Sequence, residues 1–461
     1  SASSASTTAK TRALKEATVG LGVSLLLVTL LAAPQLWPTL RYLPYTSRQG
    51  FSQAALLTGS IRPYEALAWI VPGFFGWGAA TYHGSMRYLF SSDYLGLLPL
   101  CLAAGGLSAL WKRDTRVRWL ALLSLTAFFF AQSRWTPFYA VFRHLPVVPG
   151  FRIWYRILFL NTFAICILAA LGFDALISTS TRRKALRGAL IFLALAAVFA
   201  AGAWLLAPSQ ARAGLNQVQK AGCSLAPPTA IALLTDLSRG SALRSLELLA
   251  LLTALLGLFR RRPLVVPALA LALAFHAYDQ SRIFERFVTF MNPADAVAKP
   301  DAQLPPPPTS DADPWRVYAL DTSHPNEATR LGYENLAGYE SMPLKNFQDL
   351  TDAFKSSPGA YYNLMGERYW FLPIQKRSMD RTPSGDLSIR ENREAYPRAW
   401  LVGKSRAVSD KAETYALLAR HAFDPRSEVA VSADLRLAGS APRGSVHWLK
   451  RSPLAFSLAV D

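Results

Sequence analysis

Long apolar blocks alternate with short basic segments over the first two thirds of the chain. Seven blocks reach or approach the roughly 17 residues that a membrane-spanning helix needs. They cover residues 17–33, 93–111, 117–132, 153–177, 186–206, 243–259 and 263–279. Because lipid offers the backbone no hydrogen-bond partner, each block is predicted to be an α-helix. The third, sixth and seventh blocks are short, so a buried or re-entrant helix is the alternative for each.

Basic residues gather in four of the segments beside these blocks. The clusters are Lys10, Arg12 and Lys15; Lys112, Arg113, Arg116 and Arg118; Arg182, Arg183, Lys184 and Arg187; and Arg260, Arg261 and Arg262. All four fall on one side of the membrane if the seven spans alternate in direction, and the positive-inside rule makes that side cytoplasmic. The pattern therefore predicts a helical membrane domain over residues 1–298, with outer loops at 34–92, 133–152 and 207–242.

The pattern changes after residue 298. Residues 299–314 contain the proline-rich run LPPPP and are predicted to be a linker. Strand patterns follow at 314–321, 367–374, 397–408 and 427–432, helix patterns at 346–357 and 412–423, and a β-hairpin pattern at 445–461. The predicted fold class is therefore a multi-span α-helical membrane domain of about seven transmembrane helices, followed by an extracytoplasmic α/β domain over 315–461. We expect this second domain to be incomplete, because the last sheet does not close.

Charge separates the same two regions. The chain has a net charge of +19, and residues 1–298 carry 28 Lys and Arg against 10 Asp and Glu, whereas residues 299–461 carry 21 against 20. A basic and apolar region favours anionic lipid as its partner. We expect no nucleic-acid partner, because neither a soluble basic face nor a known nucleic-acid-binding module is found.

Arginines also occur in the predicted outer loops, against the usual bias. Arg48 lies in the first outer loop, Arg152 ends the second, and Arg156 follows one turn later, so that on a helix Arg152 and Arg156 share a face. One interpretation is that these side chains snorkel to lipid headgroups. The other is a binding site for a lipid phosphate, because the arginine fork stays charged and donates paired hydrogen bonds.

Few residues suggest catalysis. P-loop, GxGxxG, HExxH and GxSxG motifs are absent from the sequence. Asp93 and Asp279 lie at the predicted outer ends of the second and seventh spans and are the catalytic candidates, as a base or as a metal ligand. Helix-end carboxylates are also common without catalysis. No metal-ligand set is assigned, and the question of a divalent metal cofactor stays open.

Several segments resemble the bacterial YfhO membrane proteins. They are PQLWPTLRYLPYTSRQGFS, IVPGFFG, SSDYLGLLPLCLAAGGL and WTPFYAVFRHLPVVPGFRIWYRILFLNTFAICILAALGFDAL, and later LGYENLAGYESMPL, YYNLMGERYW and ENREAYPRAWLV. The resemblance implies a GT-C type glycosyltransferase in the bacterial cytoplasmic membrane. Such an enzyme moves a sugar from a polyprenyl-phosphate carrier to a cell-surface glycan or polymer at the outer leaflet. It also implies a catalytic carboxylate in an outer loop among earlier spans, so we expect this chain to lack N-terminal spans and a C-terminal end.

The resemblance gives the second domain the role of orienting the acceptor. Tyr333, Asn335, Tyr339 and Glu340 are suited to bind a sugar, although ordinary loop residues would look the same. The alternative to a transferase is a non-catalytic membrane scaffold that binds a partner through this domain. A secondary transporter is disfavoured, because no internal repeat is found.

Overall fold

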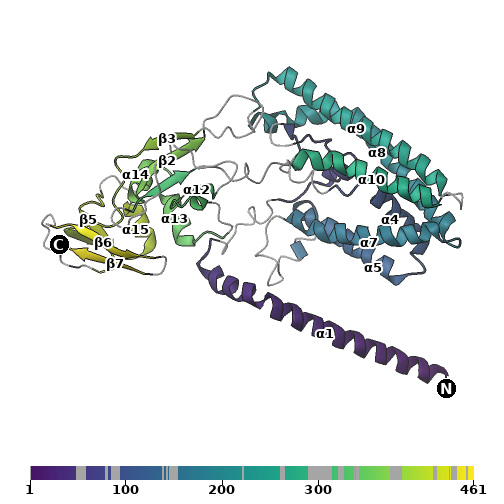
Figure 1. The fold of residues 1–461 in the computed structure, drawn as a ribbon, viewed down its shortest axis with the longest axis horizontal. Helices are drawn as coiled ribbons and strands as arrows, with labels where there is room; N and C mark the ends of the chain where they lie inside the picture. Colours follow the sequence, from purple (N-terminus) through teal and green to yellow (C-terminus); the bar gives the residue numbers. More distant parts are fainter. Residues whose placement is uncertain are drawn as a thin grey trace. The chain divides into compact units, whose positions relative to one another are not determined.

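The computed structural model describes most of the chain (Figure 1). The described residues are 2–47, 59–77, 81–84, 94–137, 154–220, 223–259, 265–288, 314–319, 326–336, 342–373, 387–418, 423–433, 444–452 and 455–461, with single positions 140, 141, 144, 338, 435 and 437. The chain divides into two compact units, one made of residues 51–296 and the other of residues 1–50 with 297–461.

The unit of residues 51–296 is built from α-helices. They are α4 (Leu97–Leu110), α5 (Thr115–Ala131), α7 (Leu158–Ile177), α8 (Arg182–Lys220), α9 (Pro227–Leu258) and α10 (Val265–Phe287), with 3-10 turns at Pro63–Trp69, Ser133–Trp135 and Trp154–Ile157. Each of the six apolar blocks predicted here overlaps one of these helices. A helix is the favoured form for these blocks in lipid, because every backbone amide is satisfied within it.

Small residues allow helices α4, α7 and α8 to pack closely. A Cβ added to Gly106 of α4 would lie 2.9 Å from the Cα of Gly172 on α7, and one added to Gly188 of α8 would lie 2.8 Å from the Ala104 carbonyl oxygen. Polar contacts add to this packing, since Ser124 of α5 donates to the buried side chain of Asn161 on α7. Close backbone approach and buried hydrogen bonds are how helices associate in lipid.

Helices α8 and α9 form a long antiparallel pair that extends past the predicted spans. Residues 207–242 were predicted to be an outer loop, yet α8 continues to Lys220 and α9 starts at Pro227. The extension has an apolar seam of Ala211, Val218 and Leu234. Such a seam stabilises a helix beyond its membrane-spanning segment, because burial and not lipid then supplies the apolar environment.

The other unit begins with α1 (Ala2–Tyr42), which continues through Pro34 and Pro38. A short 3-10 turn (Leu43–Tyr45) follows, and Ser47 then donates its amide to the Pro343 carbonyl at 2.9 Å. The stretch from Lys15 to Tyr45 is long and apolar enough to span a membrane, and none of its most apolar window is buried.

The described strands of this unit form three small sheets. In the first, β1 (Arg316–Ala319) pairs in parallel with β2 (Glu367–Pro373), which pairs antiparallel with β3 (Leu387–Glu391). In the second, β4 (Lys404–Ala407) is parallel to β5 (Glu428–Val431); in the third, β6 (Val446–Arg451) and β7 (Phe456–Val460) form the predicted hairpin. The accompanying helices are α12 (Glu327–Arg330), α13 (Lys345–Ala353), α14 (Pro358–Leu364) and α15 (Lys411–Leu418).

Most of the predicted elements of this region are present, with four differences. The strand predicted over 397–408 is regular only at 404–407, and α12, α14 and β3 were not predicted. Residues 397–403 are irregular, and within them Trp400 donates its indole NH to the Pro425 carbonyl at 2.8 Å. A local sequence pattern does not predict such a tertiary contact. The alternation of β1 is as expected, with Val317 and Ala319 buried.

Four described helical segments are long and apolar enough to cross a membrane. They are Lys15–Tyr45, Trp154–Ile177, Arg182–Lys220 and Pro227–Leu258, and the shorter α4 is also apolar. The sequence predicted about seven spans, and the helices that match the other three blocks are shorter or more polar. The total of seven and the outer position of the strand-bearing region stay predictions.

Candidate functional site

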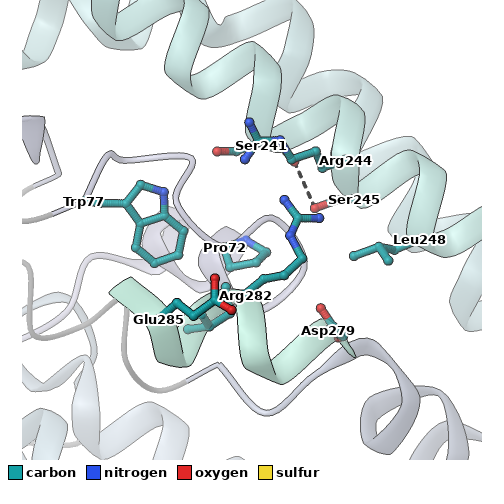
Figure 2. Close-up of a pocket in the computed structure, with 10 residues that line it drawn as sticks. Pro72, Trp77, Ser241, Arg244, Ser245, Leu248, Asp279, Arg282 and Glu285 are labelled. Carbon is teal, nitrogen blue, oxygen red and sulfur yellow. Dashed lines mark hydrogen bonds between the residues drawn. The ribbon is translucent and has the colours of Figure 1, made fainter. Parts of the chain in front are cut away.

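A polar cavity lies between helices α9 and α10 within the helical unit. Its volume is about 250 Å³, and the 59–77 segment supplies its third wall. Its lining residues are Pro72, Trp77, Ser241, Arg244, Ser245, Leu248, Asp279, Arg282, Ile283 and Glu285. On α9 the lining residues recur at helical spacing, from Ser241 to Leu248, so they share one face of the helix. Figure 2 shows this face opposite the end of α10.

Asp279 forms the floor of the cavity and is 2% exposed. Its carboxylate accepts hydrogen bonds from the Tyr94 hydroxyl at 2.9 and 3.1 Å and from the Leu97 amide at 3.2 Å. Gly96 allows α10 to approach the start of α4: its φ is +94°, and a Cβ there would lie 2.7 Å from the side-chain amide nitrogen of Gln280. Asp279 was predicted at the end of a span, whereas α10 continues to Phe287 and the carboxylate fixes α10 to the start of α4.

Two arginines and a second carboxylate complete the polar lining. Arg282 is half-buried and points from α10 toward Ser245 on α9 (Figure 2), while Arg244 and Glu285 are exposed. Among the described residues, no ion pair joins Arg244 or Arg282 to a carboxylate. Two guanidinium groups on facing helices are suited to an anion with several oxygens, such as a phosphate.

Buried polar contacts hold residues 59–77 and 81–84 in place beside the cavity. Glu65 is fully buried and accepts hydrogen bonds from the Arg62 amide at 3.1 Å and from the Tyr82 hydroxyl. The imidazole of His83 contacts the hydroxyl of Ser238 on α9 at 3.2 Å. Burial lowers the pKa of His83, so the ring is neutral near pH 7 and can make this contact without a charge.

The predicted phosphate-binding arginines are not brought together at this cavity. Arg156 is exposed in the 3-10 turn before α7, and Arg48 and Arg152 lie outside the described residues, as does the catalytic candidate Asp93. Two other loop arginines do converge: Arg62 and Arg134 lie 5.4 and 5.7 Å from the ring of Trp135. This stacking is typical of a headgroup-level surface.

The predicted acceptor-binding residues that are described have structural contacts. Tyr333 is 4% exposed and packs against Trp315 and Phe371 at ring-centroid distances of 6.0 and 5.3 Å. Asn335 bonds through its side chain to both the amide and the carbonyl of Ala319. Tyr339 and Glu340 lie outside the described residues. These positions favour support of the first sheet over contact with a sugar.

In the part of the chain that the structure describes, no three His, Cys, Asp or Glu side chains gather as metal ligands. The polar cavity itself offers two carboxylates, Asp279 and Glu285, on one helix.

The arginines of the cavity were missed by sequence reasoning, although a signal was present. Ser241, Arg244, Ser245 and Leu248 recur at helical spacing, as do Asp279 and Arg282. That spacing places each set on one helix face, but only the tertiary structure shows that the two faces meet.

Comparison with known proteins gives one match. A family model described as "Bacterial membrane protein YfhO" matches residues 4–369. No match was found among curated proteins or among solved structures.

Proposed function

Because the chain belongs to the YfhO family of bacterial membrane proteins, we propose that it serves as a membrane glycosyltransferase of the GT-C type. It takes a sugar from a polyprenyl-phosphate carrier and passes it to a cell-surface glycan or polymer at the outer leaflet of the cytoplasmic membrane. The observation that carries this proposal is the polar cavity, in which Arg244 and Arg282 face one space from two helices.

The position of the cavity in the helical unit supports an outer site. Asp279 accepts a hydrogen bond from the amide of Leu97, the first residue of α4. Helix α4 is 14 residues long, and the basic cluster 112–118 follows its last residue. Fourteen helical residues span about 21 Å, so the cavity and the cluster lie toward opposite ends of the bundle. If the basic cluster is cytoplasmic, as its charge predicts, the cavity faces the outer leaflet.

The lining residues suit transfer from a lipid phosphate. As an acceptor hydroxyl attacks the anomeric carbon, the bond from that carbon to the phosphate oxygen breaks and negative charge grows on the phosphate. Arg244 and Arg282 stabilise that charge through charge-assisted hydrogen bonds. Asp279 is engaged with two hydrogen-bond donors and positions α10, whereas the exposed Glu285 is available to take the proton from the acceptor.

The test uses the full-length protein in proteoliposomes with a polyprenyl-phosphate carrying a labelled hexose. Arg244→Ala and Arg282→Ala are each expected to lower sugar transfer to membrane glycan at least about tenfold. The matched control is Arg183→Ala, because Arg183 is exposed in the first turn of α8, at the end of the bundle near residues 112–118. Equal transfer by all three variants would overturn the proposal.

A non-catalytic scaffold is the second candidate, and the hydrogen bonding of Asp279 favours it. A carboxylate with two hydrogen-bond donors fits a structural role as well as it fits support of a catalytic site. If the unaltered protein binds the carrier but transfers no sugar in the same vesicles, the scaffold stands and the transferase fails.

A further inference from the structure

Two exposed arginines gather around one tryptophan at a surface of the helical unit. The guanidinium carbon of Arg62 lies 5.4 Å from the ring centroid of Trp135, and that of Arg134 lies 5.7 Å from it. Arg62 also donates a hydrogen bond to the Tyr64 hydroxyl at 3.1 Å. All four side chains are exposed, Tyr64 to 45% and Trp135 to 47%. These four residues form the arginine–tryptophan patch.

Buried contacts join the two loops that carry the patch. The hydroxyl oxygens of Ser60 and Ser133 lie 2.8 Å apart, and Ser60 also accepts the Arg134 amide at 3.3 Å. Next to them, the Ile61 amide donates to the carbonyl of Ala131, the last residue of α5, at 2.9 Å. The two loops are therefore fixed to each other before any ligand binds, which lowers the entropic cost of binding.

The two positive charges of the patch are not neutralised in the part of the chain that the structure describes. Among the described residues, no ion pair joins Arg62 or Arg134 to a carboxylate. Glu65, the acid closest to Arg62 in the sequence, is fully buried and accepts the Arg62 amide and the Tyr82 hydroxyl. Two exposed guanidinium groups in this state favour a ligand of negative charge.

The patch lies at the headgroup level of the predicted membrane domain. Helix α5 exposes Trp119, Leu122 and Leu125 at intervals of three residues, and this apolar stripe is suited to face lipid. The helix has 17 residues and rises about 26 Å, close to the thickness of a hydrocarbon core. Trp119 lies near its start and Trp135 just beyond its end. One tryptophan therefore marks each end of the stripe, as in the aromatic belts of membrane proteins.

We propose that the arginine–tryptophan patch binds the phosphate of an anionic phospholipid headgroup, such as phosphatidylglycerol, in the leaflet opposite the basic cluster 112–118. Arg62 and Arg134 supply charge-assisted hydrogen bonds to phosphate oxygens, and the ring of Trp135 packs against the glycerol region of the lipid. A zwitterionic headgroup fits less well, because its ammonium group would lie beside two cations. The described lining of the polar cavity includes none of the patch residues, so this lipid is a bound component of the membrane and not the substrate of the proposed transfer.

Site-specific photocrosslinking tests which lipid lies against the patch. Pro137, exposed and next to the patch in sequence, is replaced by the photoreactive residue p-benzoylphenylalanine in the full-length protein and in each variant. The protein is placed in nanodiscs of equal parts phosphatidylglycerol and phosphatidylcholine with the same acyl chains, and the crosslinked lipid is identified by mass spectrometry. The charge-removing variant is Arg62→Gln with Arg134→Gln. The matched control, Arg212→Gln with Lys220→Gln, removes two exposed charges of the same unit from α8.

The expected result is a lipid preference that depends on the two charges of the patch. The crosslink should favour phosphatidylglycerol over phosphatidylcholine at least about tenfold, because each arginine near an anionic headgroup contributes roughly a factor of five. The charge-removing variant should lower this ratio at least about fivefold, and the matched control should leave it unchanged. Arg62→Lys with Arg134→Lys keeps both charges and should keep most of the preference.

Any of four results would overturn the inference. If the unaltered patch crosslinks both lipids equally, it selects no anionic headgroup. If the charge-removing variant keeps the full preference, or if the lysine variant loses as much of it as the glutamine variant, the charges of the patch are not its cause. If glycerol phosphate, the headgroup without acyl chains, abolishes the phosphatidylglycerol crosslink at equal concentration, the site takes a free phosphate and not a membrane lipid.

Discussion

Two buried carboxylates, one in each unit, show opposite ways of placing a charge inside this protein. Asp279 in the helical unit is 2% exposed and accepts hydrogen bonds from two donors, the Tyr94 hydroxyl and the Leu97 amide. Glu367, the first residue of β2, is fully buried, and neither of its oxygens has a hydrogen-bond partner among the described residues. Aromatic rings pack beside β1 and β2: the ring centroid of Tyr362 lies 5.6 Å from that of Trp370 and 5.2 Å from that of Tyr318.

The difference in hydrogen bonding between Asp279 and Glu367 indicates which buried carboxylate is part of a preorganised site. The bonds to Asp279 join α10 to α4 and hold one wall of the polar cavity, so the charge is compensated where it lies. Burial raises the pKa of Glu367 to about 8, with Trp370 and Arg316 opposing the shift. Glu367 is therefore protonated at neutral pH and behaves as a neutral group of the sheet.

The largest expected effect is the pH dependence of the stability of the first sheet (β1, β2 and β3). An unfolded glutamate ionises above about pH 4.5, whereas Glu367 holds its proton to about pH 8, so stability falls as pH rises between these values. The full shift corresponds to about 5 kcal/mol. Hydrogen exchange of the β2 amides in the intact chain, corrected for intrinsic rates, measures it. Glu367→Gln should remove the dependence, and an identical profile in that variant would contradict this account.

The next effect is the loss of Asp279. Asp279→Ala leaves the Tyr94 hydroxyl and the Leu97 amide buried without an acceptor, and we expect unfolding in detergent micelles to require about 3 kcal/mol less free energy. Glu285→Ala, an exposed change in the same helix, is the control and should shift stability by no more than about 0.5 kcal/mol. Equal losses would mean that the bonds of Asp279 add little.

A smaller effect is expected at His83, a buried group that is satisfied yet sensitive to acid. Because burial lowers its pKa, the unfolded ring takes up a proton first as pH falls below about 6.5, and stability decreases in that direction. His83→Ala should cost about 2 kcal/mol at pH 7.5 through the lost contact with Ser238 and the space left behind. Thermal unfolding of the variant is compared with that of His447→Ala, since His447 is exposed in β6. If His447→Ala lowers the unfolding temperature as much as His83→Ala does, the structural role assigned to the buried His83 is contradicted.

The smallest effect concerns the ion pairs beside the first sheet. Glu334 contacts Arg398 closely and Arg316 at 3.6 Å, and its own side chain is 40% exposed. Glu334→Gln should therefore reduce the protection of β1 amides by no more than about 1 kcal/mol. A loss several times larger would show that this partly exposed network contributes more than the buried Glu367, reversing the comparison.

Hydropathy was sufficient to locate these helices, because each apolar block overlaps a helix of the structure. Hydropathy failed at 207–242, because the predicted apolar block ends at residue 206, just before Pro208. Ala200, Ala203, Ala207, Ala211, Gly214 and Val218 continue at helical spacing and are buried, so periodicity marks an extension that mean apolarity misses.

The candidate site was only partly predictable. Asp279 could be singled out as a carboxylate at the end of an apolar block, and it does line the polar cavity. Arg244 and Arg282 could not be joined to it, because they lie on separate helices and their meeting depends on how α9 pairs with α10. In the other unit, Tyr333 was chosen for its chemistry, but burial between Trp315 and Phe371 decides its role.

The most direct measurement is a cryo-electron microscopy map of the full-length protein in nanodiscs with polyprenyl phosphate bound. The account predicts phosphate density within hydrogen-bond distance of Arg244 and Arg282, in the polar cavity between α9 and α10. Phosphate density at another place in the protein, with the side chains of the polar cavity arranged as in the lipid-free protein, would contradict it.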